Sequence, residues 1–284
     1  GGIRGCVLAA AMVAAVGMLL VVDMGGVDRR YMNEQKWHDA APTEVVATEA
    51  DKEILKDGDL GYRVYDVDSR GSARASNFHR SVDGYHGAKL QRYDDVLHRY
   101  IYPEYSEVLA MLNTRYTIAD GAVEQNYTFG AAWFVNSVER VAPPAEELEA
   151  LGLADLATTA IVGGDVEALK AWYDASGYIE LVEYAPNYLK YEYDAPQEAL
   201  CIFSEIYYPD GWTAYVDGKE AEYFSVNYVL RGMVLPEGEH MVEWRFKAPN
   251  WTLATVVTGI ASWLILLSLV ALVAVYVYRW YKGY

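Results

Sequence analysis

A short segment of the chain combines residue types that suit binding of an anion. The glycine-flanked pair Tyr85-His86 is followed closely by Lys89 and Arg92. Lysine and arginine hold phosphate oxygens through charge-assisted hydrogen bonds, and flanking glycines let backbone donors approach a ligand closely. The pattern therefore indicates contact with a phosphate or a sugar. The alternative is a glycine-rich turn that packs Tyr85 and His86 under the domain.

The residues around this pair form the most clearly basic segment of an otherwise acidic domain. An anionic ligand would be repelled by such a domain unless local cations offset the field. The alternative is that these cations pair with nearby acids and hold the surface together. The segment contains His79, Arg80, His86, Lys89, Arg92, His98 and Arg99 against Asp83, Asp94 and Asp95.

No complete catalytic or metal site is evident in the rest of the sequence. The five His residues are scattered, Asp57-Gly58-Asp59 does not fit a calcium loop, and neither a nucleophile elbow nor a phosphate loop is present. Adjacent helical residues such as Asp94-Asp95 point about 100° apart, which is typical of a solvated face. Trp212 is expected to fill a sheet or interfacial position rather than stack on a sugar. We predict no catalytic residue, metal or cofactor in this chain.

The first half of the region between the apolar segments has an α+β pattern, and we assign it to residues 33–177. Its helices are predicted from apolar residues at helical spacing, two of them with prolines at or near the start. The expected helices are Lys89–Ile101, Glu104–Asn113 after Pro103, Ala145–Leu151 and Val166–Tyr173, and the expected short strands include Tyr62–Tyr65, Tyr116–Ile118 and Ala131–Val135.

From Tyr178 onward the pattern is almost entirely β. Short alternating segments recur, which predicts an antiparallel β-sandwich-like module over residues 178–250. Asp217-Gly218 is a strong two-residue hairpin signal and is interpreted as a structural turn. Pro236–Glu239 predicts a second turn.

Two apolar segments flank this region and are predicted to span a membrane. Residues 5–22 and 252–278 approach or exceed the roughly 20 apolar residues that a helical span needs. Arg4 lies before the first segment, and Arg279 and Lys282 lie after the second, so both ends are expected to be cytoplasmic and the central domain extracytoplasmic. Because the chain begins Gly-Gly-Ile-Arg without Met, we expect it to be a fragment of a longer membrane protein.

The charge of the central domain excludes some partners. All 40 Asp and Glu residues fall between Asp23 and Lys247, with 20 of the 23 Lys and Arg residues. This balance argues against nucleic acid, whose binders present basic patches, and against a surface that lies on anionic lipid. A disulfide between Cys6, in a predicted span, and Cys201 is not expected.

An ordered series of motifs carries a resemblance to a known family. The motifs are Gly84–Leu90 with Arg92-Tyr93, Met111–Tyr116, Ala132–Val135, Phe203–Tyr208, Gly211-Trp212, Tyr215–Gly218 and Pro236–His240. In this order they resemble the C-terminal part of the bacterial membrane protein YfhO family, and the resemblance covers nearly the whole chain. Gly130-Ala131-Ala132 departs from the Gly-Asn-Ala expected before Trp-Phe.

This resemblance implies a multi-pass protein of the bacterial cytoplasmic membrane, similar to GT-C glycosyltransferases. Its partners would be membrane lipid, a polyprenyl-phosphate-linked sugar and an envelope glycan acceptor. The catalytic acid of that class is expected upstream of Gly1, so none is assigned here. The alternative is a non-enzymatic extracytoplasmic binding or scaffold module anchored in the membrane. Further spans upstream of Gly1, with an acidic residue in the first outer loop, would favour the enzyme.

Overall fold

A computed structural model describes residues 2–31, 45–142, 144–164, 166 and 169–283 of the protein. The chain forms two compact units, Gly1–Val46 and Ala47–Tyr284. The start of the region assigned to residues 33–177, up to residue 44, lies outside the described residues.

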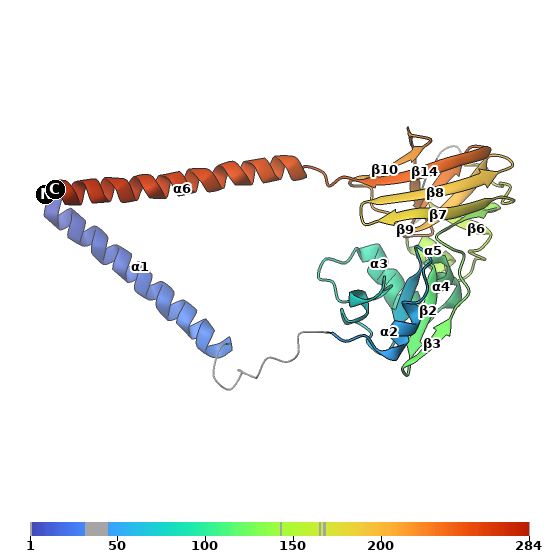
Figure 1. Cartoon of the computed structure of the whole chain (residues 1–284), viewed down its shortest axis with the longest axis horizontal. Helices are drawn as coiled ribbons and strands as arrows, with labels where there is room; N and C mark the ends of the chain where they lie inside the picture. The colour runs from blue at the N-terminus through green and yellow to red at the C-terminus, as the bar shows by residue number, and fades with distance from the viewer. Residues whose placement is uncertain (1, 32–44, 143, 165, 167–168, 284) are drawn as a thin grey trace. The chain divides into compact units, whose positions relative to one another are not determined.

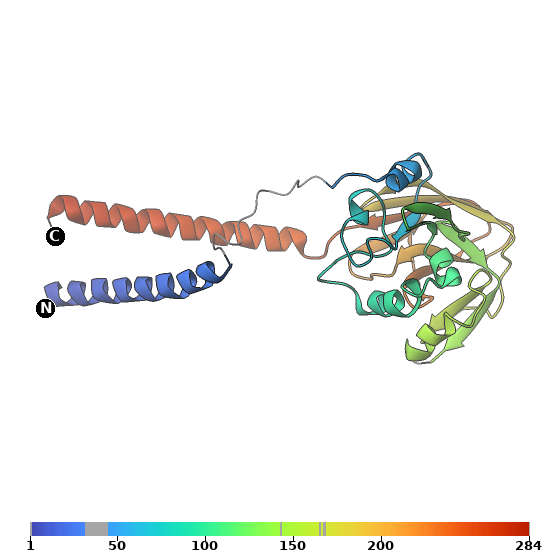
Figure 2. The same cartoon turned by 90° about the horizontal axis from the view of Figure 1, so that it is seen from below.

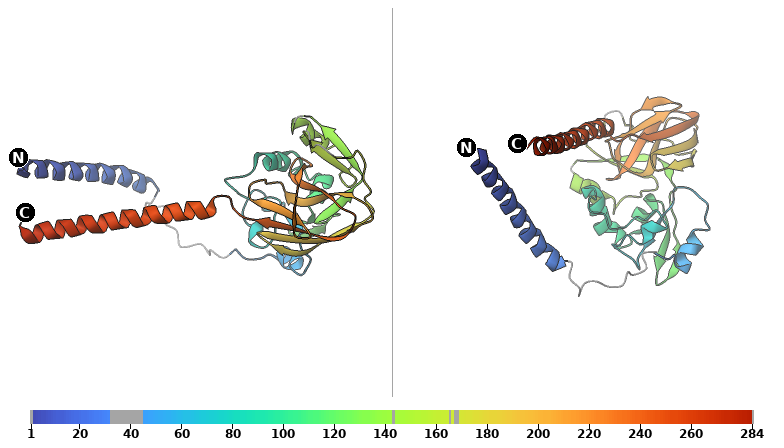
Figure 3. Two further views of the ribbon diagram at one scale, coloured as in Figure 1. Left: turned by 90° about the horizontal axis from the view of Figure 1, so that it is seen from above. Right: turned by 60° about the vertical axis from the view of Figure 1, so that its left-hand side comes forward.

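Two long apolar helices agree with the two predicted spans. Helix α1 covers Gly2–Tyr31 (Figure 3), and helix α6 covers Trp251–Lys282 without interruption (Figure 2). The portions long and apolar enough to cross a membrane are Ala11–Tyr31 and Trp251–Lys282. Helix α1 continues beyond the predicted end at Val22 because none of the charged residues that follow breaks a helix. The described side chains of α6 are all exposed, as expected of a helix whose natural environment is lipid.

The domain begins with helix α2 (Glu49–Ile54) and a three-stranded sheet in the order β1-β2-β3. Strand β1 (Arg63–Asp66) is parallel to β2 (Thr114–Ala119), and β2 forms a hairpin with β3 (Ala122–Gln125). The strands predicted near Tyr62 and Tyr116 are confirmed. A short 3-10 helix, η2 (Ala75–Asn77), follows β1.

The helices predicted over Lys89–Ile101 and Glu104–Asn113 are shorter in the structure. Helix α3 (Gln91–Val96) continues as a π turn, η3 (Leu97–Ile101), and α4 covers Ser106–Met111. Pro103 does not start α4, because Glu104 adopts a left-handed backbone with φ of 62° that ends the preceding turn. Helix α5 (Pro144–Ala150) agrees with the predicted helix over Ala145–Leu151. The buried residues of these segments join one hydrophobic core, which includes Leu97, Ile101, Val108, Met111, Leu112 and Leu151.

The helix predicted over Val166–Tyr173 is wrong for its described residues. None of residues 166 and 169–173 is helical. Their backbone instead bonds to the segment around β5 (Ser137–Val141): Tyr173 N donates to Asn136 O at 2.7 Å, and Trp172 forms an antiparallel bridge with Ser137. Strand β5 pairs in parallel with β6 (Thr159–Gly163). Tertiary pairing has therefore overridden the local helical spacing.

The C-terminal half forms two antiparallel sheets (Figure 1). The first sheet has the order β11-β10-β14-β8-β7 and the second β12-β13-β9-β4. Their strands are β4 (Ala132–Val135), β7 (Tyr178–Ala185), β8 (Tyr188–Ala195), β9 (Ala199–Ile206), β10 (Trp212–Val216), β11 (Lys219–Ala221), β12 (Phe224–Val226), β13 (Leu230–Leu235) and β14 (Gly238–Phe246).

These two sheets share a core that contains side chains from both. Trp244 of β14, Tyr191 of β8 and Phe203 of β9 are completely buried in it. Strand β4 belongs to the second sheet, pairing with β9, although it precedes residue 178. The antiparallel module is therefore completed by a strand from the α+β half.

The two predicted turns have different roles. Asp217 and Gly218 have φ of 49° and 77°, and they join β10 to β11 as the hairpin signal predicts. The turn before Gly238 joins β13 to β14, and these strands lie in different sheets. It therefore carries the chain from one layer of the module to the other.

Candidate functional site

The loop before α3 presents two of the predicted contact residues to solvent. Tyr85 is 78% exposed and His86 is also exposed, so neither packs under the domain. The Nδ1 atom of His86 accepts a hydrogen bond from Ala88 N at 3.1 Å. A neutral His86 would therefore carry its proton on Nε2, where it can donate to a ligand. Gly84, with φ of 139°, provides the backbone turn that leads into the loop.

Tyr85, His86 and Lys89 line one pocket of about 320 Å³. Lys89 lies just before α3 rather than within it, and its Nζ is 3.9 Å from Asp94 Oδ1. At that distance the amine keeps most of its donor capacity. The remaining lining residues are Arg63, Ser76, Ser81, Val82, Asp83, Gly84, Tyr93, Leu97 and Ile206.

Arg92 is separated from the other three predicted residues. Its Nη1 donates to Tyr228 O at 3.0 Å and lies 3.3 Å from Glu147 Oε2. Its guanidinium also stacks over the Tyr228 ring, 4.8 Å from the centroid. Glu147 is buried, and this burial raises its pKa, although the positive charge of Arg92 opposes the shift. Arg92 therefore compensates a buried carboxylate, and only part of its donor capacity faces a ligand.

Most other cations of the predicted basic segment also have partners. His79 contacts Asp51 at 3.0 Å, His98 lies 3.5 Å from Asp94, and Arg99 lies 3.9 Å from Glu149. Arg80 stacks over Tyr184 at 3.4 Å from the ring centroid. Most cations of the basic segment therefore serve in contacts within the domain. Of the four predicted contact residues, Tyr85, His86 and Lys89 remain available to a ligand.

A second pocket of about 480 Å³ adjoins the first and is mostly apolar. Both linings include Tyr93 and Ile206. The further lining residues of this apolar pocket are Leu90, Gln91, Arg92, Tyr207, Tyr208, Pro209, Ser225, Tyr228 and Val229. We call the first pocket the cationic pocket, because Arg63, His86 and Lys89 line it. A cationic pocket beside an apolar one suits a ligand with an anionic head and a hydrocarbon portion.

The apolar pocket lies close along the chain to the start of α6. Pro209 is two residues from Gly211, whose carbonyl accepts a hydrogen bond from Lys247 N at 2.8 Å. Helix α6 begins at Trp251. Extended backbone covers at most about 3.5 Å per residue, so the pocket rim lies within about 25 Å of the first turn of α6.

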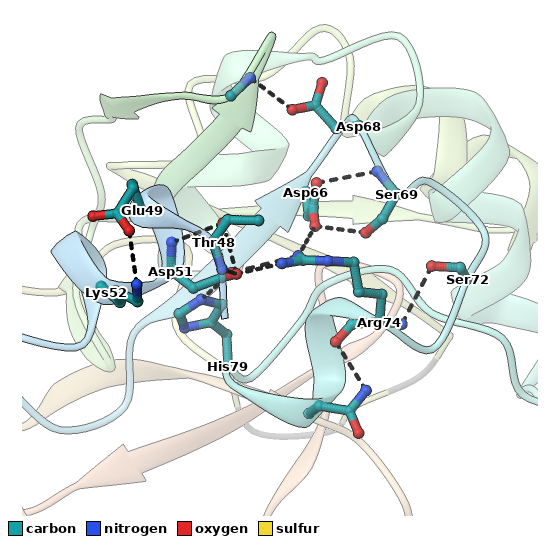
Figure 4. Close-up of polar contacts among 12 residues, drawn as sticks. Thr48, Glu49, Asp51, Lys52, Asp66, Asp68, Ser69, Ser72, Arg74 and His79 are labelled. Atoms are coloured by element: carbon teal, nitrogen blue, oxygen red, sulfur yellow. Dashed lines mark hydrogen bonds and ion pairs between the residues drawn. The ribbon is translucent and has the colours of Figure 1, made fainter. Parts of the chain in front are cut away.

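The sequence did not indicate that Arg63 lines the cationic pocket or that Asp51 organises a buried ion-pair network. Arg63 lines the cationic pocket from β1 and is held by Glu205 at 3.0 Å and by Leu112 O at 2.9 Å. No sequence pattern near Arg63 indicates this role, because its partners Glu205 and Leu112 are far away along the chain. Asp51 is the centre of a buried network with Arg74 and His79, shown in Figure 4. The capping pattern Thr48–Asp51 was its only sequence signal.

Comparison with known families tests the resemblance. Residues 148–258 match the family model described as bacterial membrane protein YfhO. The predicted resemblance is confirmed over these residues, and the motifs before residue 148 lie outside the match. The YfhO match covers the β-sandwich strands β7–β14 and contributes Ile206, Tyr207, Tyr208 and Tyr228 to the pockets, whereas the loop that carries Tyr85 precedes it. No curated protein and no solved structure matches the chain. The YfhO match and the two apolar helices together indicate a membrane protein.

Proposed function

We propose that this domain binds the phosphate-bearing head of a lipid-linked sugar, as the C-terminal part of a multi-pass GT-C-like glycosyltransferase of the bacterial cytoplasmic membrane. The observation that carries the proposal is the pair of adjoining pockets. Lys89 and His86 supply cationic and neutral donors on one side, and Tyr207, Tyr208 and Pro209 supply apolar walls on the other. Charge-assisted donors suit the phosphate, and the apolar walls suit the first units of a hydrocarbon chain.

The short distance along the backbone from the apolar pocket to α6 supports a lipid-linked ligand. A lipid-linked phosphate remains at the membrane surface, so a domain that binds it must hold its pocket near its own anchor. The path from Pro209 through the Gly211–Lys247 hydrogen bond to Trp251 provides that proximity. The sugar would then extend from the phosphate past Tyr85, the exposed aromatic residue of the loop.

Lys89 and His86 are the residues to substitute, because Arg92 has a structural partner. The double variant Lys89→Gln/His86→Gln is expected to weaken binding of a prenyl phosphate about tenfold or more, since the positive charge of Lys89 and the imidazole N–H of His86 are lost. The measurement is binding of a short-chain prenyl phosphate to the chain in lipid nanodiscs, with the prenyl alcohol as the uncharged comparison. Lys56→Gln, an exposed lysine in the turn after α2 with an exposed partner, is the matched control.

The outcome is interpretable only if folding is unchanged, which a thermal melt checks. Equal affinity of wild type and double variant, or equal affinity for phosphate and alcohol, would overturn the proposed site. Substituting Arg92 would confuse the test, because it leaves Glu147 buried without its cation.

The alternative function is a non-enzymatic membrane-anchored module that binds or scaffolds envelope components. One observation favours it: Asp83, the carboxylate that lines the cationic pocket, already accepts hydrogen bonds from Gly71 N and Gly84 N at 2.6 Å and Tyr102 OH at 3.3 Å. Asp83 therefore holds the loop in place, and its oxygens are already occupied rather than free to act as a catalytic acid or base. Sugar transfer by the longer protein distinguishes the two functions, because a scaffold keeps prenyl-phosphate binding but supports no transfer.

Both functions require residues 45–250 to lie outside the cytoplasm. We expect cysteine placed at Leu153, which is 88% exposed, to react with a membrane-impermeant thiol reagent in intact cells. The parent chain is the control, because its Cys201 is buried and its other cysteine, Cys6, belongs to a predicted span. Ser69 is less suitable than Leu153 for the cysteine, because its backbone N and its Oγ both donate hydrogen bonds to the Asp66 carboxylate. Labelling of Leu153→Cys only after lysis would reverse the proposed orientation.

A further inference from the structure

A third pocket, of about 480 Å³, lies beside α4 and the β2–β3 hairpin. Its lining includes Glu107, Thr117, Glu124, Asn126 and Tyr127. It shares no residue with the two pockets described above. None of its side chains has a role in the proposed lipid-phosphate site, so its composition can be considered independently.

The pocket carries negative charge that the described residues do not neutralise. Glu107 Oε2 is buried and has no hydrogen-bond partner among the described residues. Glu104, a third carboxylate at the pocket, lies 3.4 Å from Arg70 Nη2, whereas no described cation forms an ion pair with Glu107 or Glu124. A buried carboxylate oxygen without a donor is costly. A ligand that brings an N–H donor, preferably a charged one, would remove that cost.

The rest of the lining suits a hydroxyl-rich ligand. Gln125 adds an amide, and Ser106 adds a hydroxyl. Asn126 Nδ2 donates to Thr114 O at 3.0 Å and to Thr117 Oγ1 at 2.9 Å, so its amide is fixed in orientation. Tyr127 is 78% exposed, and its ring contacts Phe129 edge-on at 5.9 Å between centroids. An exposed aromatic ring provides a surface on which a sugar ring can stack.

We propose that this pocket binds an amine-bearing sugar. The ammonium group would lie at Glu107 and Glu124, the hydroxyl groups would contact Gln125 and Ser106, and a face of the sugar ring would lie against Tyr127. A neutral sugar would leave Glu107 Oε2 without a charged donor, and a simple amine would leave the amides and the tyrosine unused. The combination therefore selects a ligand that carries both groups.

The test is calorimetric titration of the chain in lipid nanodiscs with glucosamine oligomers in mildly acidic buffer, in which the sugar amine is protonated and exposed carboxylates stay ionised. N-acetylglucosamine oligomers are the comparison, since acetylation removes the positive charge while keeping the ring and its hydroxyls. We expect acetylation to weaken binding about tenfold or more, because it removes a charge-assisted contact. Equal affinity for the two oligomers, or absence of glucosamine binding, would overturn the proposal.

Variants assign the binding to this pocket. Glu107→Gln is expected to weaken glucosamine binding about tenfold, whereas Glu146→Gln, an exposed acidic residue of α5, leaves it unchanged. Tyr127→Ala removes an exposed side chain, so it is expected to weaken binding even if Glu107→Gln disturbs folding. Unchanged binding in a folded Glu107→Gln variant and in Tyr127→Ala would contradict the site. Prenyl-phosphate binding should be unaffected by either variant, because the pockets share no residue.

Discussion

Asp51→Asn is expected to destabilise the domain by about 3–5 kcal/mol, the cost of breaking a buried ion pair from one side. Asp51 is fully buried at the start of α2. Its carboxylate forms an ion pair with Arg74, accepts hydrogen bonds from Thr48 N and Thr48 Oγ1 at 2.7 Å each, and lies 3.0 Å from His79 Nε2 (Figure 4). Asparagine keeps the size but loses the charge and one acceptor oxygen. Arg74 would then retain only Asp66, at 3.0 Å.

Denaturant unfolding followed by tryptophan fluorescence measures this change. The matched control is Glu49→Gln, which removes an exposed carboxylate of the same helix from its contact with Lys52. The control is expected to change little, because exposed ion pairs contribute little to stability. If Asp51→Asn behaves like Glu49→Gln, the network does not hold α2 on the domain.

The same carboxylate predicts a dependence of stability on pH. Burial by itself would raise the pKa of Asp51, but hydrogen bonds from Arg74, Thr48 and His79 outweigh it and hold the pKa well below its usual value of 3.8. The unfolded chain therefore binds this proton more readily than the native domain. The stabilisation is present above pH 3.8 and is lost as the pH falls below that value. In Asp51→Asn, stability should fall less steeply over this acid range.

Trp244→Ala is expected to cost about 3–5 kcal/mol, the usual range for removing a large buried aromatic side chain. Trp244 has no exposed surface. Its ring contacts Phe203 at 5.2 Å and Tyr223 at 4.8 Å between centroids, both edge-on, and the Arg231 guanidinium lies 4.8 Å from its centroid. Alanine would leave a cavity between the two sheets and would remove one of the aromatic rings against which the buried Arg231 packs.

Trp172→Ala is the matched control for this variant. Trp172 is 61% exposed, and the bridge that it forms with Ser137 uses backbone atoms. The control should therefore unfold at nearly the same denaturant concentration as the parent chain. Similar losses in Trp172→Ala and Trp244→Ala would mean that the two sheets do not share the closely packed core described above.

The sequence by itself determined the apolar helices, the β-rich C-terminal half and two turns. Each depends on information within a short segment: about 20 apolar residues for a span, alternation for a strand, and a residue pair that accepts positive φ at Asp217-Gly218. The family resemblance was likewise carried by local motifs, and the family match confirms it for residues 148–258. The glycines around Tyr85 and His86 indicated a turn, but the sequence left open whether these two side chains are exposed or packed under the domain.

Tertiary structure decided which of these local patterns work together. Strand β4 joins β9 across a long stretch of sequence, and the segment at Tyr173 bonds to Asn136 instead of forming the predicted helix. Arg92 was assigned to a ligand with Lys89 because the two are close in sequence, yet it compensates Glu147, which α5 brings to it. Ion pairing and burial depend on neighbours that are distant along the chain, and no local pattern encodes them. The pockets arise in the same way, because their walls come from segments that only the folded domain brings together.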